Sequence, residues 1–413
     1  MQIIKPVSKM NEKPAATLAE RFEEPKATEA EAPKKRERLF SLDFLRGADI
    51  FILTVVSVIC YTVDKHFPLP EWFMKQLNHP DWVGFSAFDM IMPLFIFMCG
   101  AALPLALPRR LNEDGTAGWK YWSHVFTRVA MLWALGMIAQ GELFTFDLHR
   151  ISFFNNTLQT IAVGYLITAA VALIKSYKVQ IAVPFVLAAI YTAFLHLCGD
   201  MTPSGNAAVV YEVKFLELFY PVNAAMEWHP VRQIAAWHYT WWTPVPMFGV
   251  MGLAGYHATK VLMTEAWSKK RRCAVQALVG VALLALGFAL LTFDPCIKHI
   301  FTASFTALAM GVSFLLYAGC YWLFDIVEWR VGTSLISLFG RHSLAAYMFV
   351  ETVFGSILWV FANILLCNKG KPLVDGISRW FGDQATYDIV FTVVRAVVLV
   401  LILRLFDRKR KAK

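Results

Sequence analysis

Long apolar runs separated by short polar segments make up most of this sequence. A helix needs about 20 mostly apolar residues to cross the hydrocarbon core of a bilayer. Ten stretches meet this requirement, and they begin near Phe44, Ala87, Val125, Phe154, Val179, Trp242, Cys273, His299, Leu335 and Thr386. The pattern therefore predicts an all-α, polytopic integral membrane protein with about ten transmembrane helices within residues 38–407.

The composition agrees with a membrane protein and excludes an ordinary soluble domain. Hydrophobic residues make up 57% of the chain and charged residues 17%, and the mean hydropathy is +0.51; soluble domains carry about 25% charged residues. Residues 1–37 lack an apolar stretch, so we expect a disordered cytoplasmic tail there, and residues 408–413 form a second, basic tail. The net charge of +9 comes from such tails and from short loops, which indicates membrane topology and no nucleic-acid partner.

The distribution of basic residues predicts the orientation of the chain. Cytoplasmic loops of membrane proteins carry an excess of Lys and Arg. With ten spans and a cytoplasmic N-terminus, the basic segments all fall inside: residues 34–36, Arg109 and Arg110 with Lys120, Lys175 with Lys178, residues 269–272, Arg330 and the C-terminus. Both termini are thus expected in the cytoplasm, and the loop of residues 199–240 is expected outside. His79 then lies on the outer side, between the first two spans.

A histidine and two carboxylates, Asp81 and Asp89, directly precede the main apolar run of the second predicted span. A histidine side chain can exchange a proton near neutral pH, so His79 can accept a proton from an attacking nucleophile. Ionisable groups at the edge of a membrane need a partner or a function, so His79 is the first candidate for chemistry. Asp89 has two interpretations: it can serve the same site, or it can form a helix-capping box with Ser86.

The first predicted span begins with a charged cluster, Asp43, Arg46 and Asp49. Spacing by three residues places these side chains within one arc of a helix. Arg46 can then bridge both carboxylates as a self-compensated ion cluster, or face a phosphate group from the cytoplasmic end. Arg128, in the third predicted span, is a further cation that can join the cluster.

Two groups of polar side chains lie within or beside later spans. Asn155, Asn156 and Gln159 precede or begin the fourth span, where they either line a polar pocket or cap the helix. Residues 340–343 place polar side chains in the ninth span, with Glu351 nearby. These side chains can either serve a function inside the helix bundle or form hydrogen bonds between helices.

The outer loop is rich in aromatic and histidine residues, in residues 227–230 and 237–242. Aromatic faces stack on sugar rings, but aromatic residues also mark the membrane interface of any membrane protein. His229 and His238 lack the spacing of metal ligands, and the seven cysteines show no metal-binding pattern. We therefore expect no metal site.

Specific motifs in the first two spans relate the chain to a known family. These motifs are Leu42-Asp43-x-x-Arg46-Gly47, His79-x-x-Trp82-x-Gly84 and Asp89-x-x-x-Pro93-Leu94-Phe95-x-Phe97-x-x-Gly100. In them the sequence resembles the heparan-α-glucosaminide N-acetyltransferase family of transmembrane acyltransferases, most closely its bacterial branch. The resemblance extends over residues 38–407 and is looser after the second span, for example at residues 301–305 and 340–344.

The resemblance implies a reaction and a set of partners. An acetyl group would pass from cytoplasmic acetyl-CoA to an amino sugar or glycan on the other side of the bilayer. The membrane would be a bacterial cytoplasmic membrane. No metal would take part, and the protein could be a homodimer. His79 matches the catalytic histidine of the family and would act as a base or carry the acetyl group. The expected catalytic residues are His79, Asp89 and Ser57, and the expected cofactor-binding residues are Arg46, Asp43, Arg128, Gln159 and Asn156.

Three departures from the family pattern bear on function. Ser57 stands where an asparagine that assists the histidine is expected, and Thr160 replaces a basic residue. Residues 241–246 (Trp-Trp-Thr-Pro-Val-Pro) stand in place of an Asp-Pro-Glu-Gly-Leu element. The alternative hypothesis is a membrane carrier or sugar-binding protein that kept the acyltransferase fold without catalysis.

Overall fold

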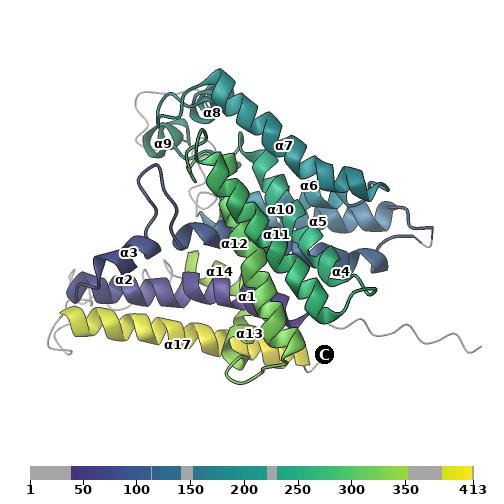
Figure 1. The fold of residues 1–413 in the computed structure, drawn as a ribbon. Coiled ribbons are helices and arrows are strands. Elements are labelled where there is room, and N and C mark those ends of the chain that lie inside the picture. The colour runs from purple at the N-terminus through teal and green to yellow at the C-terminus, as the bar shows by residue number, and fades with distance from the viewer. Residues whose placement is uncertain (1–38, 113, 141–151, 221–229, 352–383, 412–413) are drawn as a thin grey trace, which may run out of the picture. The chain divides into compact units, whose positions relative to one another are not determined.

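The computed structural model describes residues 39–112, 114–140, 152–220, 230–351 and 384–411, and every regular element in these ranges is a helix (Figure 1). The predicted all-α class is therefore confirmed for the described part of the chain. The predicted tail of residues 1–37, the outer-loop residues 227–229, the second half of the ninth predicted span and the last two residues of the basic tail lie outside the described residues.

The helices follow one another in a simple order. They are α1 (Phe40–Phe51), η2 (Ile52–Val56), α2 (Ser57–His66), α3 (Glu71–Leu77), η3 (Phe88–Met90), α4 (Ile91–Ala106), η4 (Leu107–Arg109), α5 (Trp119–Ala139), α6 (Thr157–Val171), α7 (Tyr177–Cys198), α8 (Ala207–Glu217), α9 (Pro230–Trp237), α10 (Val245–Leu262), α11 (Lys269–Leu290), α12 (Ala303–Tyr321), η6 (Trp322–Ile326), α13 (Ser334–Arg341), α14 (Ser343–Glu351) and α17 (Gln384–Lys411). The short elements η2 and η6 are π-helical turns that continue the helices before them.

Six helical segments in the described ranges are long and apolar enough to cross a membrane. They are Phe40–His66, Phe88–Arg109, Tyr177–Cys198, Lys269–Leu290, Ala303–Ile326 and Asp388–Arg408. A helix also lies at each of the other four predicted positions, as α5, α6, α10 and α13 with α14. These four are shorter or less apolar, so their crossing of the membrane stays a prediction.

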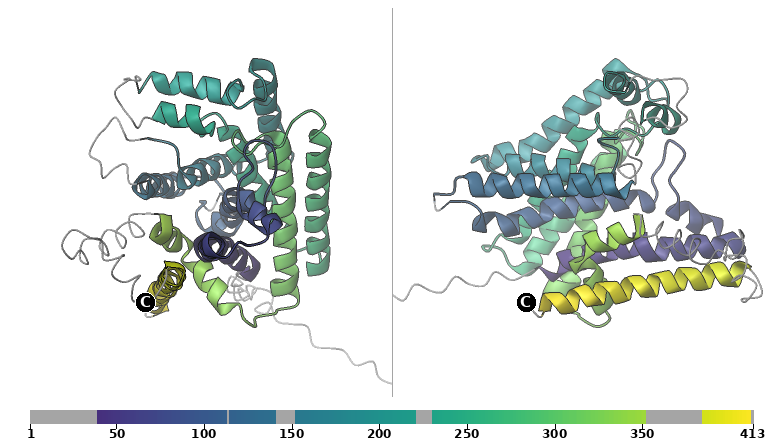
Figure 2. Two further views of the ribbon diagram at one scale, coloured as in Figure 1. Left: turned by 90° about the vertical axis from the view of Figure 1, so that its left-hand side faces the viewer. Right: turned by 180° about the vertical axis from the view of Figure 1, so that it is seen from behind.

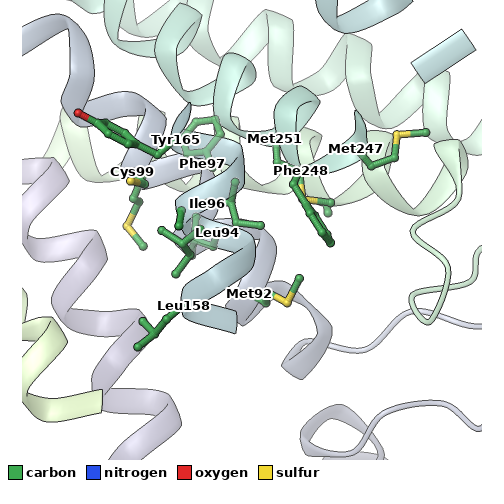
Figure 3. Close-up of a cluster of buried hydrophobic side chains, with 14 of the residues drawn as sticks. Met92, Leu94, Ile96, Phe97, Cys99, Leu158, Tyr165, Met247, Phe248 and Met251 are labelled. Atoms are coloured by element: carbon green, nitrogen blue, oxygen red, sulfur yellow. The ribbon is translucent and has the colours of Figure 1, made fainter. Parts of the chain in front are cut away.

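Helix α4 forms the centre of the bundle, and its neighbours include α10, α6, α12 and α1. Its side chains Ile96 and Phe97 are fully buried, as are Phe248 and Met251 of α10; Figure 3 shows this cluster around α4. The backbones of α4 and α10 touch where Gly100 faces Gly252, because a Cβ atom on Gly100 would overlap the carbonyl of Gly252. The close approach holds α4 in a fixed position.

Helix α2 runs beside α17, and α11 lies beside α12 (Figures 1 and 2). Asp325, in the turn after α12, fixes the start of α1 because its two carboxylate oxygens accept the N–H groups of Phe40 and Ser41, each at 3.1 Å. A carboxylate at a helix N-terminus satisfies unpaired donors and opposes the positive end of the helix dipole. This contact sets the position of Arg46, which lies about one and a half turns further along α1.

The ion pairs of α17 explain the polar residues predicted in the ninth span. Arg341 forms a two-point contact with Asp407, at 2.8 and 3.2 Å, and Nε2 of His342 lies 3.4 Å from the same carboxylate. Arg341, the last residue of α13, and His342, in the turn after it, therefore both bond to α17. Glu351 is the last residue of α14, and its side chain lies outside the described part of the structure.

Candidate active site

His79 and Asp89 lie side by side at the start of α4. Nδ1 of His79 lies 2.7 Å from Oδ1 of Asp89, and the Asp89 side chain is fully buried whereas that of His79 is 44% exposed. A carboxylate accepts the proton of Nδ1, which leaves Nε2 of the imidazole able to accept a proton from another molecule. This is the arrangement of a general base that a carboxylate orients.

The same carboxylate also closes the start of the helix. Oδ2 of Asp89 accepts the N–H of Ser86 at 2.9 Å, and Oγ of Ser86 accepts the N–H of Asp89 at 3.3 Å. These are the two reciprocal bonds of a capping box. The two interpretations of Asp89 therefore do not compete, because one oxygen fixes the helix start and the other orients His79.

Lys298 completes this group, although it is not among the predicted site residues. Its Nζ lies 3.3 Å from Oδ1 of Asp89 and 3.1 and 3.2 Å from Nδ1 and Nε2 of His79. The ammonium therefore lies against both the imidazole and the carboxylate that orients it. Burial lowers the pKa of Lys298 below its ordinary value, and the Asp89 carboxylate opposes this shift.

Hydrogen bonds hold the loop that carries Lys298 in place. The carbonyl of Cys296 accepts the N–H of Gly84, in the His79 loop, at 2.9 Å. The carbonyl of Ile300 accepts the hydroxyl of Tyr191 at 2.8 Å, and Asp294 accepts the N–H of Ser304 at 2.8 Å at the start of α12. A functional group is held in a productive geometry when its supporting loop has few alternative conformations.

A cavity of about 770 Å³ extends from this group along α4. One end, which we call the His79 end, is lined by His79, Lys298, Tyr239 and Trp241, and the other, which we call the Arg110 end, is lined by Arg110 and His124. Ile91 and Arg110 both line the cavity. They are 19 residues apart along the helix, which corresponds to about 28 Å. This length approaches the thickness of the hydrocarbon core of a bilayer.

Two arginines line the cavity between its ends. Arg46 lies 3.6 Å from Asp43, and Arg128 lies 3.2 Å from Sγ of Cys99 and over the ring of Tyr165. Both guanidinium-bearing residues line the same cavity, and the joining of Arg128 to the cluster around Arg46 stays a prediction. Asp49 is different: it is buried, its Oδ2 has no hydrogen-bond partner among the described residues, and no contact joins it to Arg46.

The predicted amides lie elsewhere. Gln159 accepts the N–H of Asn155 and donates to the carbonyl of Phe153, each at 2.9 Å. Asn156 caps α6, where its Oδ1 accepts the N–H of Leu158 at 2.8 Å. The first N–H groups of a helix have no intrahelical partner, and these side chains meet that local need. The wall of the cavity beside them is formed by Thr157, Leu158 and Ile161 instead.

Ser57 and Thr160 also bond within their own helices. The hydroxyl of Ser57 donates to the carbonyl of Leu53 at 2.7 Å, and that of Thr160 donates to the carbonyl of Thr157 at 2.7 Å. Both residues are buried, and neither is among the described residues that line the cavity. Of the predicted site residues, the structure places His79, Arg46 and Arg128 on the wall of one cavity. Asp89 and Asp43 lie beside His79 and Arg46, and Ser57, Asn156 and Gln159 are not among the described lining residues.

Glu212 of α8 positions the aromatic wall near His79. Its carboxylate accepts the N–H groups of Trp241, Trp242 and Thr243 at 2.7, 3.0 and 3.1 Å, and the hydroxyl of Thr243 at 3.0 Å. The side chain is fully buried, and this burial raises the pKa of Glu212 to about 7, although the four donors oppose the shift. Residues 241–243 are thus held by an acid of helix α8.

Comparison with known proteins adds no relative: no family model matches this chain, and no curated protein matches it. A histidine paired with a carboxylate can remove a proton, an ammonium beside it can stabilise negative charge, and arginines along the cavity can bind an anion. These three abilities together are those of a group-transfer site for an anionic donor.

Proposed function

We propose that this protein is a transmembrane acetyltransferase that moves an acetyl group from cytoplasmic acetyl-CoA to an amino sugar or glycan on the opposite side of the membrane. The observation that carries this proposal is the cavity, which joins the His79–Asp89–Lys298 group to Arg46, Arg128 and Arg110. The resemblance of the first two spans to heparan-α-glucosaminide N-acetyltransferases supports the same reaction.

The arginines provide the donor side of the proposed reaction. CoA carries phosphate groups at its nucleotide end, and guanidinium groups bind phosphate with charge-assisted hydrogen bonds. Cys99, beside Arg128, and Asp89 lie ten residues apart along one helix, which corresponds to about 15 Å. The apolar wall between them, with Met92 and Phe95, suits the extended pantetheine arm that would bring the thioester to His79.

The His79 end provides the chemistry. Nε2 of His79 takes the proton of the acceptor as it attacks the thioester carbonyl, and the Asp89 carboxylate stabilises the imidazolium that forms. The carbonyl oxygen becomes negative in this step and needs a donor. Lys298 is placed for that role because its Nζ lies 3.1 to 3.2 Å from the ring nitrogens of His79 and lines the cavity.

The proposed direction of transfer follows from the expected topology. Ten spans with both termini in the cytoplasm would place the Arg110 end of the cavity at the cytoplasmic surface, where acetyl-CoA is available, and the His79 end outside. The basic segments at residues 109–110 and 269–272 support this orientation through the positive-inside rule. The resemblance to the bacterial branch of the family is the reason that we propose a bacterial cytoplasmic membrane as the location of the protein.

The test is a transfer assay with purified full-length protein, radiolabelled acetyl-CoA and a panel of amino sugars and glycans. We expect label to appear in at least one acceptor and to be lost in His79→Ala. The second candidate function is a carrier, which is favoured by the length of the cavity along α4. Uptake of sugar into vesicles without acetyl-CoA, combined with no label transfer, would support the carrier and contradict the enzyme.

A further inference from the structure

Beyond the His79 end, basic side chains line the cavity at two successive levels. The first, which we call the inner level, is formed by Arg46 and Arg128, whose like charges act on each other. The second is the Arg110 end, which is formed by Arg110 and His124. The cavity therefore offers two places for negative charge, one after the other along its length.

Helix α5 sets the spacing of the two levels. The α5 side chains that line the cavity recur at intervals of three and four residues, which places them on one face of the helix; they are His124, Thr127, Arg128, Met131 and Leu132. His124 precedes Arg128 by four residues, which corresponds to about 6 Å along the helix axis. The charge of Arg110 acts on Tyr165, the residue whose ring Arg128 covers. The two levels are thus neighbours, about one helical turn apart.

The positive charge at these levels is only partly balanced within the described protein. Asp43 lies 3.6 Å from Arg46, which is too long for a hydrogen bond. Arg128 contacts a thiol and an aromatic ring, and none of the described carboxylates forms an ion pair with Arg128 or Arg110. A cation inside a helix bundle is costly unless an anion accompanies it. A ligand with negative charge at both levels would supply the missing partners.

From this spacing, and resting on the proposed acetyl transfer, we infer that Arg110 and His124 bind the 3′-phosphate of CoA, while Arg46 and Arg128 bind its diphosphate. CoA carries negative charge at these two places, and one ribose separates them. The inference makes the Arg110 end the part of the cavity that selects the donor. It distinguishes acetyl-CoA from thioesters that have the same pantetheine arm and diphosphate but lack the 3′-phosphate.

The side chains at the Arg110 end suit a phosphate monoester. Such a group carries about two negative charges near neutral pH, so it needs several donors of its own. The guanidinium of Arg110 can donate two parallel N–H bonds to it, and the imidazole of His124 adds one N–H when neutral and a second when protonated. None of the described lining side chains is Asp or Glu, so no carboxylate of the described wall repels the phosphate.

The order of the sites along the cavity matches the order of the groups in the donor. Cys99, beside Arg128, lies ten residues after Asp89 along the helix, a distance of about 15 Å that the pantetheine arm would fill. With the thioester at His79 and the diphosphate at the inner level, the nucleotide points toward the Arg110 end. The 3′-phosphate then meets its donors one helical turn beyond the diphosphate.

The test compares CoA with 3′-dephospho-CoA, which lacks this one phosphate. Dissociation constants are measured by displacement of radiolabelled acetyl-CoA from full-length protein in lipid nanodiscs, without any acceptor. We expect 3′-dephospho-CoA to bind about tenfold to a hundredfold more weakly than CoA, because hydrogen bonds between charged groups are lost. Equal affinities would overturn the inference and leave acetyl transfer intact. Absence of saturable acetyl-CoA binding would contradict the proposed function itself, and the inference with it.

Substitutions locate the phosphate. In Arg110→Gln and in His124→Ala, the affinity for CoA should fall while the affinity for 3′-dephospho-CoA stays near the wild-type value, so the ratio of the two shrinks. In Arg46→Met both compounds should lose affinity alike, because both carry the diphosphate, and the ratio should persist. Lys120→Gln is the matched control on α5, since Lys120 is exposed and is not among the described lining residues; it should keep both dissociation constants.

Two results with these variants would overturn the inference. A wild-type ratio in both Arg110→Gln and His124→Ala would mean that the 3′-phosphate binds elsewhere. Loss of the ratio in Arg46→Met alone would place the 3′-phosphate at the inner level. If Arg110→Gln does not fold, Arg110→Lys provides the measurement: it keeps the charge but not the two-point contact, so its ratio should lie between one and that of the wild type, and a wild-type ratio would count against Arg110.

Discussion

The ammonium of Lys298 lies 3.3 Å from the same Asp89 oxygen that contacts Nδ1 of His79 at 2.7 Å. The contact joins the loop after α11 to the start of α4, and Gly84 and Cys296 link the same two loops through their backbones. Asp89 is therefore neutralised by a cation while it orients a base. Oδ2 of Asp89 also accepts the N–H of Ser86, so the buried carboxylate keeps a hydrogen bond when either partner of Oδ1 is removed.

Substitution of Lys298 should affect catalysis more than folding. Lys298→Met removes the donor that faces the developing oxyanion, so we expect the turnover number for acetyl transfer to fall by about 10²- to 10³-fold. Lys298→Arg should restore part of the rate because the charge beside Asp89 is kept. Turnover of both variants, measured with labelled acetyl-CoA at saturating acceptor, checks this expectation, and equal rates for Lys298→Met and wild type would contradict it.

The buried lysine also predicts a pH dependence. Burial lowers the pKa of Lys298 below the ordinary value of 10.5, so the ammonium loses its proton at a lower pH than an exposed lysine does. Because the protonated form is the active one, transfer should decline on the alkaline side before pH 10.5 is reached. Lys298→Arg should lack this decline, since guanidinium keeps its proton throughout the accessible range.

Arg46 should be required for binding of the donor. Arg46→Met removes a guanidinium from the cavity wall, and loss of a hydrogen bond to a charged group weakens binding by about tenfold to a hundredfold. We expect the increase in melting temperature that CoA gives the wild type to vanish in this variant. Arg271→Met is the matched control, because Arg271 is exposed, packs over Trp267 and is not among the described lining residues. A full CoA-induced shift in Arg46→Met would remove Arg46 from the donor site.

Local patterns predicted the parts of the site that lie close together in sequence. His79, Ser86 and Asp89 come from a single segment, so one motif contained both the base and its carboxylate. Lys298 approaches from the other end of the chain, and helix periodicity carries no information about such a contact. One signal was nevertheless present: Lys298 lies in a loop expected outside, where the positive-inside rule makes a lysine unusual.

The amides at the start of α6 show a case in which residue type and spacing do not decide between two uses. Asn155, Asn156 and Gln159 are the residue types that line polar pockets, and they are equally the types that cap helices. Sequence spacing does not distinguish these uses, because both place the side chains at the same helix end. In the fold, the unpaired N–H and C=O groups next to them are the nearest partners, and Asn156 and Gln159 bond there.

Glu212 gives a prediction about stability. Its pKa is about 7 in the fold and 4.5 as an unperturbed carboxyl. Between these pH values the folded protein holds a proton that the unfolded chain releases, so raising the pH favours unfolding, by about 3 kcal/mol over the whole interval. The melting temperature of the wild type should fall between about pH 5 and pH 8, and Glu212→Gln should reduce that fall.

The matched control for this acid is Glu217→Gln, at an exposed position of the same helix, which should leave the pH dependence unchanged. Glu212→Gln also replaces an acceptor of four donors with an amide that has one acceptor oxygen. The backbone of residues 241–243 then loses partners, so the KM for the sugar acceptor should rise through displacement of Trp241. A melting temperature with the same pH dependence in Glu212→Gln as in the wild type would show that Glu212 does not titrate in this range.

The orientation of the chain can be tested by chemical labelling. A cysteine placed at Asn78, in a background where the exposed Cys198 is replaced by alanine, should react with a membrane-impermeant thiol reagent in intact cells. A cysteine placed at Lys270 should react only after the membrane is permeabilised, because its segment carries the basic residues expected in the cytoplasm. The reverse pattern would invert the topology and the proposed direction of acetyl transfer.

His79 is the residue on which the proposed mechanism depends most directly. Its side chain is 44% exposed, and the start of α4 is closed by Ser86 and Asp89 without it. His79→Ala should therefore fold and express like the wild type. Loss of a general base lowers turnover by about 10²- to 10⁴-fold, and the labelled acetyl-CoA assay must resolve rates in that range.

A second histidine in the same chemical setting provides the control. Nε2 of His66 lies 2.7 Å from a carboxylate oxygen of Asp388, but His66 is not among the described residues that line the cavity. His66→Ala removes a histidine–carboxylate pair of the same kind and should keep nearly full turnover. If His79→Ala and His66→Ala transfer acetyl groups at the same rate, the pairing with Asp89 serves structure alone, and the proton must leave the acceptor by another route.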